Sequence, residues 1–209
     1  MVTAIHPRFE FRIFGNHMDK IISKIVEFSP KEMTREMNSI YLLAAGNPKH
    51  NIKIRDGVMD IKTLEQKKDG LEQWNPFLVG EFPLKAEVIK SVVFPALGTE
   101  SPVFDREEYT LQQFIDELIA VDPDITIASV CKKRDAFTVG KCITEIAEVK
   151  VNGAMIKTIC IEAEEPKKVL KAKKKLHINE DMENVNYPLA LKRIMGLVEL
   201  PEQWQAKEF

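Results

Sequence analysis

Residues 8–13 read Arg-Phe-Glu-Phe-Arg-Ile, so charged and apolar side chains alternate strictly along this segment. Successive side chains of a β-strand point to opposite faces. The segment is therefore predicted to be a strand with one apolar face and one face that carries Arg8, Glu10 and Arg12. An apolar face packs on a core, whereas a charged face usually meets water.

The same alternation recurs at residues 52–55, 59–62 and 158–164. The charged faces of these segments carry lysine and arginine, which suit phosphate oxygens, and glutamate, which suits a divalent cation. If several such faces curve inward together, they line a polar cavity for a polyanion and a metal ion. The pattern therefore predicts a β-structure whose charged faces bind a ligand.

The chain has 209 residues, a net charge of −2 and 44% hydrophobic residues. This length suits one large β domain that spans residues 1–209, and the hydrophobic content is ample for a core. Because basic and acidic residues nearly cancel, no general attraction to nucleic acid or to a membrane is expected. The oligomeric state is left open by the sequence.

The three cysteines, Cys131, Cys142 and Cys160, form no CxxC motif. An odd number without metal-site spacing predicts reduced, buried thiols in a cytosolic protein. The N-terminal residues lack a basic region followed by an apolar stretch, so no signal peptide is expected. No apolar run approaches the roughly 20 residues of a transmembrane helix. These features together predict a cytoplasmic protein.

Two dipeptides typical of hairpin turns, Asp56-Gly57 and Asn152-Gly153, each join two strand-like segments. Pro76 makes the segment around it an edge strand or a bulged strand. The fold class is α+β, in which about eight strands form one antiparallel sheet that could close into a barrel with helices outside. Strands are expected at 7–14, 33–45, 50–56, 58–66, 74–82, 125–139, 141–151 and 155–164. Helices are expected at 17–28, 84–94, 111–121 and 186–198 and in a lysine-rich segment that begins at Pro166, with a loop at 95–104.

Charged motifs follow one another in a definite order from Glu10 to Glu164. A Glu-x-basic strand precedes a Lys-x-Arg strand, a lysine on its hairpin partner, a Lys-Lys-Arg strand, an acidic strand and a closing Glu-x-Glu strand. This series resembles the CYTH superfamily, also called triphosphate tunnel metalloenzymes. Its members include thiamine triphosphatases, inorganic triphosphatases and class IV adenylate cyclases. The resemblance implies an eight-stranded antiparallel tunnel that binds a triphosphate and a divalent metal.

The resemblance assigns roles to residues of this chain. Mg²⁺ or Mn²⁺ would be held by Glu10, Glu162 and Glu164, and the catalytic carboxylates would be these three together with Glu148. The triphosphate would be bound by Arg8, Arg12, Lys53, Arg55, Lys62, Lys132 and Arg134. Alternation places Lys133 on the opposite face from Lys132 and Arg134, where a surface charge is expected.

The first strand departs from the superfamily pattern. The pattern is Glu-x-Glu-x-Lys, and the aligned residues here are Arg8, Glu10 and Arg12. The departure removes a carboxylate from the region of the expected metal and adds a cation there. Magnesium usually takes one or two carboxylates together with phosphate and water, so Glu10 could still serve.

Two glutamates compete for the inward position on the acidic strand. Glu145 and Glu148 are three residues apart, so a regular strand cannot point both inward. Glu145 shares its face with Ala147, Val149 and Val151, which is typical of a core face. Alternation therefore favours Glu148, and a bulge would admit both.

Metal-dependent hydrolysis of a triphosphate-containing substrate is the leading functional hypothesis. The substrate would be a small molecule such as inorganic triphosphate, thiamine triphosphate or a nucleoside triphosphate. A non-catalytic nucleotide- or polyphosphate-binding protein is the alternative, because Arg8 adds a cation where the superfamily has a carboxylate. A class IV-type adenylate cyclase is a second alternative, since it would use the same phosphate site.

Overall fold

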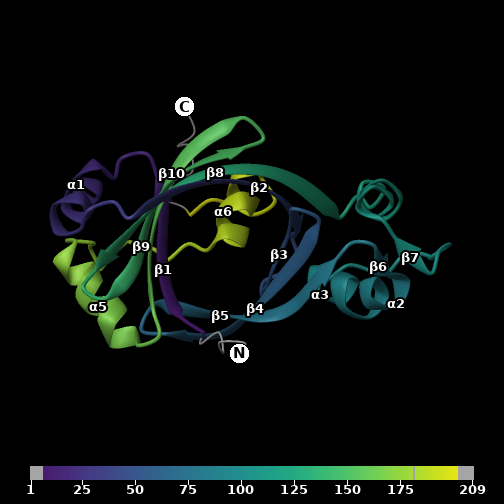
Figure 1. Ribbon diagram of the computed structural model, residues 1–209. Helices are drawn as coiled ribbons and strands as arrows, with labels where there is room; N and C mark the ends of the chain where they lie inside the picture. The colour runs from purple at the N-terminus through teal and green to yellow at the C-terminus, as the bar shows by residue number, and fades with distance from the viewer. Residues whose placement is uncertain (1–6, 181, 202–209) are drawn as a thin grey trace.

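The computed structural model describes residues 7–180 and 182–201. Eight strands form a closed antiparallel barrel in the order β1-β10-β9-β8-β2-β3-β4-β5, as Figure 1 shows. The α+β class and the closed barrel expected from the sequence are thereby confirmed. The barrel strands are β1 (Phe9–Gly15), β2 (Met33–Ala44), β3 (His50–Arg55), β4 (Val58–Lys68), β5 (Leu71–Glu81), β8 (Ile125–Val139), β9 (Cys142–Val151) and β10 (Ala154–Ala163).

The remaining elements are helices and one small sheet. Residues 84–85 and 108–109 pair as β6 and β7, a two-stranded sheet that the sequence did not predict. Pro95 was expected in a loop but lies in a short helix. The elements are α1 (Asp19–Phe28), β6 (Leu84–Lys85), α2 (Ala86–Val88), the π-helical η1 (Ile89–Val93), α3 (Phe94–Leu97), β7 (Glu108–Tyr109), α4 (Leu111–Gln113), the π-helical η2 (Phe114–Ile119), α5 (Pro166–Lys175) and α6 (Tyr187–Ile194).

Helices α1 and α5 cover one side of the barrel, at the left of Figure 1. Phe9, Phe11 and Ile13 of β1 are buried in the same cluster as Ile25 of α1 and Val169 of α5. These three residues of β1 are therefore the outward-facing ones. Because side chains alternate along a strand, Arg8, Glu10 and Arg12 face the barrel interior.

Residues 84–119 cover a different side of the barrel, at the right of Figure 1. Ile52 and Ile54 of β3 and Met59 of β4 are buried against Phe94 and Phe114 of this segment. The charged residues that alternate with Ile52, Ile54 and Met59 consequently face inward.

Helix α6 lies within the ring of strands, as Figure 1 shows. Tyr187 and Leu191 of this helix are buried with Tyr41, Val130 and Val149, which alternate with the outward residues of their strands. Part of the barrel interior is therefore apolar and filled by α6. The polar part lies beside it.

The contact between β1 and β5 closes the barrel and is short. β1 pairs with β10 from Phe9 to Gly15, but its pairing with β5 comprises only Phe9 with Gln73 and Glu10 with Glu72. Asn184 bridges the remainder: its Oδ1 accepts from the Arg12 backbone N–H at 2.8 Å, and its Nδ2 donates to the Glu10 and Gly70 carbonyls at 3.1 and 3.0 Å. The segment before α6 thus completes the closure.

Two further findings bear on the sequence-based expectations. Cys142 and Cys160 are buried free thiols, but Cys131 is exposed, so the expectation of three buried cysteines was wrong for Cys131. Over the described part of the chain, none of the helices combines the length and apolar character that crossing a bilayer requires.

Candidate anion-binding site inside the barrel

Most of the charged residues singled out in the sequence lie on the inner faces of the barrel strands. Arg12 on β1 is in contact with Glu145 on β9, although 133 residues separate them in sequence. The strand register makes Lys53 on β3 face Asp60 on β4. The inward charged residues at this level include Arg8, Glu10, Arg12, Lys53, Arg55, Asp60, Lys62, Glu72, Lys132, Arg134, Glu145 and Glu162.

Arg12 is among the most enclosed of these residues, together with Glu145. Its side chain is only 7% exposed, with Nε 2.8 Å from Glu10 Oε1 and Nη1 3.0 Å from Glu145 Oε1. Its guanidinium also lies over the Tyr187 ring, 4.7 Å from the centroid. Two carboxylates and an aromatic face therefore already satisfy Arg12, which leaves it little capacity for a ligand. The resemblance described above implies that this residue binds the triphosphate.

Glu145 is in contact with three cationic side chains, those of Arg12, Lys132 and Arg134. Its Oε1 lies 2.6 Å from Lys132 Nζ, in addition to its contact with Arg12, and its Oε2 lies 3.1 Å from Arg134 Nε. Burial favours the neutral acid, but Arg12 and Lys132 outweigh burial and lower the pKa of Glu145 to about 2. The Arg134 Nε contact lacks hydrogen-bond geometry, and the Arg134 side chain is 27% exposed. Arg134 is consequently freer than Lys132 to meet a ligand.

The position of Glu145 corrects the prediction for the acidic strand. Glu148 is exposed and is paired in register with Lys133 and Lys157, so it lies on the outer face and not in the interior. Alternation was applied correctly, but the apolar face was assigned to the wrong side. Ala147 and Val149 face inward because α6 fills that part of the barrel. Glu148 is therefore removed from the candidate site.

Arg8 and Glu162 form a looser pair at the edge of this network. Arg8 Nη1 lies 3.5 Å from Glu162 Oε2, and their side chains are 44% and 28% exposed. Glu162 is also the register partner of Glu10. Burial and the charge of Glu10 raise the pKa of Glu162, whereas Arg8 acts against this rise. At Glu10 burial also opposes ionisation, but Arg12 outweighs it and the pKa is lowered.

The strands β3 and β4 supply a second group of inward cations. Lys53 Nζ pairs with Asp60 Oδ2 at 2.6 Å and is mostly buried, and burial lowers the pKa of Lys53. Arg55 Nε donates to Ser39 Oγ at 2.9 Å. Within residues 7–180 and 182–201, neither Arg55 nor Lys62 has a carboxylate within ion-pair distance. These two residues therefore carry positive charge that a bound anion could neutralise.

The carboxylates offer only a partial metal site. Among the described residues, no three His, Cys, Asp or Glu side chains lie close enough to hold a metal ion together. Glu164 is exposed, follows the end of β10 and acts electrostatically on Lys168 of α5. Glu10 and Glu162 do face inward as neighbours across β1 and β10. Two carboxylates suit Mg²⁺ when phosphate oxygens and water supply the remaining ligands.

Some residues at the site could not be identified from the sequence. The Tyr187 ring stacks on Tyr41 at 5.8 Å between centroids and lies 5.1 Å from Lys132 Nζ. Glu72 is buried, with Oε1 2.9 Å from Lys67 Nζ and Oε2 accepting from Asn186 at 2.9 Å. Tyr187 and Asn186 follow the barrel strands by more than 20 residues and carry no motif that would link them to the site.

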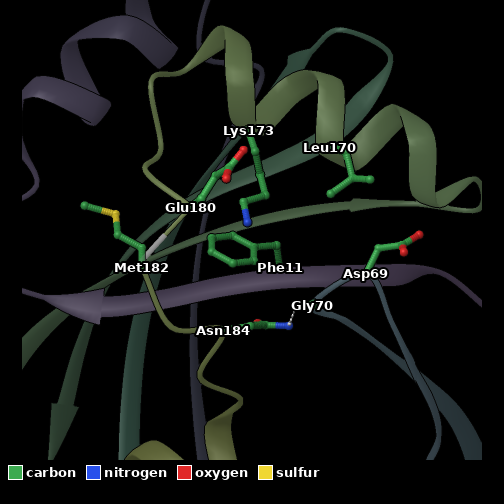
Figure 2. Close-up of a pocket in the computed structure, with 8 residues that line it drawn as sticks. All are labelled: Phe11, Asp69, Gly70, Leu170, Lys173, Glu180, Met182 and Asn184. Carbon is green, nitrogen blue, oxygen red and sulfur yellow. Dashed lines mark hydrogen bonds between the residues drawn. The ribbon is translucent and has the colours of Figure 1, made fainter.

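A separate pocket of about 330 Å³ lies outside the barrel, between β1, the turn before β5, and α5. Figure 2 shows Lys173 pointing from α5 toward the outward ring of Phe11, with its ammonium 3.5 Å from the ring centroid. Asp69 and Glu180 line the same pocket. None of the charged residues assigned from the sequence lines it, so it is distinct from the interior site.

Comparisons with known proteins add to this geometry. No protein-family model and no curated protein matches the chain. Among solved structures, the chain is similar to a candidate adenylyl cyclase from Hippeastrum that has a dominant triphosphatase activity. The identity is 13% and the TM-score 0.50, over 95% of this chain and 100% of the Hippeastrum chain. The chain therefore shares the fold of the Hippeastrum protein, here a closed eight-stranded antiparallel barrel.

Two further solved structures are similar with lower scores. A conserved hypothetical protein from Pyrococcus furiosus has 17% identity and a TM-score of 0.48, with 88% of this chain and 99% of that chain covered. A candidate adenylate cyclase from Bacillus halodurans has 9% identity and a TM-score of 0.46, with 87% and 95% covered. At such identities the likeness concerns the fold, and the chemistry has to be argued from the site.

Proposed function

We propose that the barrel interior binds a triphosphate chain and hydrolyses its terminal phosphoanhydride bond with the help of Mg²⁺ or Mn²⁺. The observation that carries this proposal is the surplus of inward cations. Arg55 and Lys62 lie on adjacent strands and lack carboxylate partners among the described residues. A linear polyanion is the ligand that neutralises several separated cations at once. The triphosphatase activity of the Hippeastrum protein, which shares the fold, supports the choice of reaction.

The role of each side chain would depend on whether other residues of the protein already hold it in place. Arg8, Arg55, Lys62 and Arg134 would bind phosphate oxygens and orient the chain. Arg12 and Lys132, which are held by Glu145, would keep the interior shape and its positive potential. Glu10 and Glu162 would hold the divalent cation together with phosphate oxygens. The cation would supply charge neutralisation and polarisation of a phosphoryl oxygen. Positioning and electrostatic stabilisation account for most of the rate in phosphoryl transfer.

The test is phosphate release from inorganic triphosphate, ATP and thiamine triphosphate, each with Mg²⁺, Mn²⁺ or EDTA. We expect metal-dependent release from at least one substrate. Glu162→Gln removes a carboxylate charge with little change of shape and should abolish that release. The matched control is Glu148→Gln, because Glu148 is exposed on the outer face. Unchanged release by Glu162→Gln, or equal losses in the two variants, would refute the assignment.

Binding without hydrolysis is the second candidate, and Arg8 is the observation that favours it. The Arg8 guanidinium lies 3.5 Å from Glu162, where it opposes a metal ion. Calorimetric binding of triphosphate without any phosphate release would support this candidate. In that case Arg8→Glu, which restores the carboxylate of the superfamily pattern, is expected to create metal-dependent release. Formation of cyclic AMP from ATP would instead identify an adenylate cyclase.

A further inference from the structure

Each of the two carboxylates that could hold a metal ion is paired with an arginine, and one ion pair is held more tightly than the other. Glu10 is bound by Arg12 at 2.8 Å, and Arg12 is itself enclosed by Glu145 and Tyr187. Glu162 is bound by Arg8 at 3.5 Å, and the Arg8 side chain is 44% exposed. Only Arg8 can leave its carboxylate without disrupting a buried network.

A divalent cation and the Arg8 guanidinium compete for the same carboxylate. An ion placed between Glu10 and Glu162 would lie close to both Arg8 and Arg12, and like charges at this range repel. Glu72 lies beside Glu10 on β5 but is already bound by Lys67 and Asn186, so among the described residues little remains to offset that repulsion. The free protein is therefore expected to bind a bare divalent cation weakly.

A triphosphate changes this balance because it offers Arg8 a better partner. Guanidinium groups bind phosphate oxygens in a bidentate manner, and each such bond is charge-assisted. An exposed ion pair at 3.5 Å contributes little, so its loss is a small obstacle. Once Arg8 moves to the phosphate, Glu162 is free, and the phosphate oxygens complete the ligands of the cation.

We propose that Arg8 makes metal binding conditional on the polyanion: it pairs with Glu162 in the free protein and moves to a phosphate oxygen when a triphosphate enters, which opens the Glu10–Glu162 pair to Mg²⁺ or Mn²⁺. This inference rests on the proposed function, since it presupposes that a triphosphate binds in the barrel. Arg8 is a ligand-binding residue in this scheme. It sets the order in which the ligands bind and does not act on the reacting atoms.

The first measurement is calorimetric binding of Mn²⁺ alone to the wild type, Arg8→Gln and the double variant Arg8→Gln/Glu162→Gln. We expect Arg8→Gln to bind Mn²⁺ about tenfold more tightly than the wild type, because a charge-assisted contact no longer competes. The double variant should lose that gain. Lys133→Gln is the matched control, because it removes a positive charge from the exposed outer face of β8 and should leave Mn²⁺ affinity unchanged.

The second measurement is binding of inorganic triphosphate in EDTA. Here Arg8→Gln should bind about tenfold more weakly than the wild type, the opposite direction to its effect on Mn²⁺. A merely structural role of Arg8 would not produce opposite changes in the two affinities. Arg8→Lys keeps the charge but loses the bidentate geometry, so we expect intermediate values for both ligands.

The outcomes separate the two claims. If the wild type binds no triphosphate with or without Mn²⁺, the proposed function and the role of Arg8 both fail. If the wild type binds triphosphate but Arg8→Gln leaves the affinity for Mn²⁺ alone unchanged, only the role of Arg8 fails. An unchanged affinity of Arg8→Gln for triphosphate in EDTA would also overturn that role, because Arg8 would then make no contact with the phosphate.

Discussion

Arg8 and Arg12 project from the same face of the chain four residues apart, yet their surroundings are opposite. Arg12 is 7% exposed and contacts two carboxylates and an aromatic ring. Arg8 is 44% exposed, and its ion pair within the described part of the chain is the 3.5 Å contact with Glu162. A motif that aligns both residues with a ligand site cannot make this distinction. Burial and the number of partners determine which cation supports the barrel and which is available to a ligand.

The largest expected effect comes from removing the buried arginine. Arg12→Met leaves Glu10 and Glu145 without a common partner in a desolvated interior, and breaking a buried ion pair typically costs about 3–5 kcal/mol. We expect a loss of this size in the free energy of unfolding, measured by urea denaturation. Arg8→Met is the matched control and should cost less than about 1 kcal/mol. Similar losses in both variants would remove the distinction between the two arginines.

Acid should weaken the buried region through Glu145. Its pKa is lowered from an ordinary value of 4.5 to about 2, so its contribution is fully present above about pH 4.5 and is lost as the pH falls toward 2. Glu162 acts in the opposite sense, because its raised pKa favours the folded state when the carboxyl is protonated. Urea unfolding from pH 6 to pH 2.5 should therefore show a steeper decline for the wild type than for Glu145→Gln. Parallel declines would mean that other groups control acid stability.

A smaller effect is expected at the ligand-accessible cations. Arg55→Ala should weaken triphosphate binding about tenfold or more, since a lost charge-assisted hydrogen bond is worth about 1.5–3 kcal/mol. The free energy of unfolding should change little, because Ser39 is the only polar partner of Arg55 among the described residues. Calorimetric titration with inorganic triphosphate, beside urea denaturation of the same sample, gives both values. Normal affinity in this variant would exclude Arg55 from the site.

The smallest effect is expected at the Tyr187 hydroxyl. This oxygen is buried and has no hydrogen-bond partner in the described part of the chain, whereas the ring stacks on Tyr41 and lies beneath Arg12. Tyr187→Phe keeps the ring and should change the free energy of unfolding by no more than about 0.5 kcal/mol. Tyr187→Ala should cost about 3–5 kcal/mol, as expected for a buried aromatic ring. A large loss with Phe would reveal a role for the hydroxyl.

Much of the barrel could be predicted because its strands alternate visibly. The strand β8 was predicted with the bounds that it has, and β5 carries a register shift where Pro76 predicted an edge or a bulge. The strands β6 and β7 were missed because two-residue strands have no detectable period. Helix α6 was expected as an amphipathic helix, but its place within the barrel depends on tertiary packing that a local pattern does not contain.

The candidate site was predictable in its composition and less so in its geometry. Alternation correctly paired Lys132 with Arg134 on one face and Lys133 on the other. It failed for Glu145, because apolar neighbours were interpreted as an outer core when they line the part of the interior that α6 fills. It also could not show that Arg12 is already neutralised. Part of that information comes from Glu145, 133 positions away in the chain.

The short contact between β1 and β5 has a consequence for how the chain is made. β1 depends on β10 for most of its backbone hydrogen bonds and on Asn184 for much of the rest of its closure. During synthesis on a ribosome, β2 to β5 can pair as soon as they emerge, but β1 must wait until about 150 more residues have followed it. Contacts that are so distant in sequence form slowly because a long loop has to close first. We therefore expect the nascent barrel to remain an open sheet, with β1 unpaired and within reach of chaperones, until its last strand has left the exit tunnel.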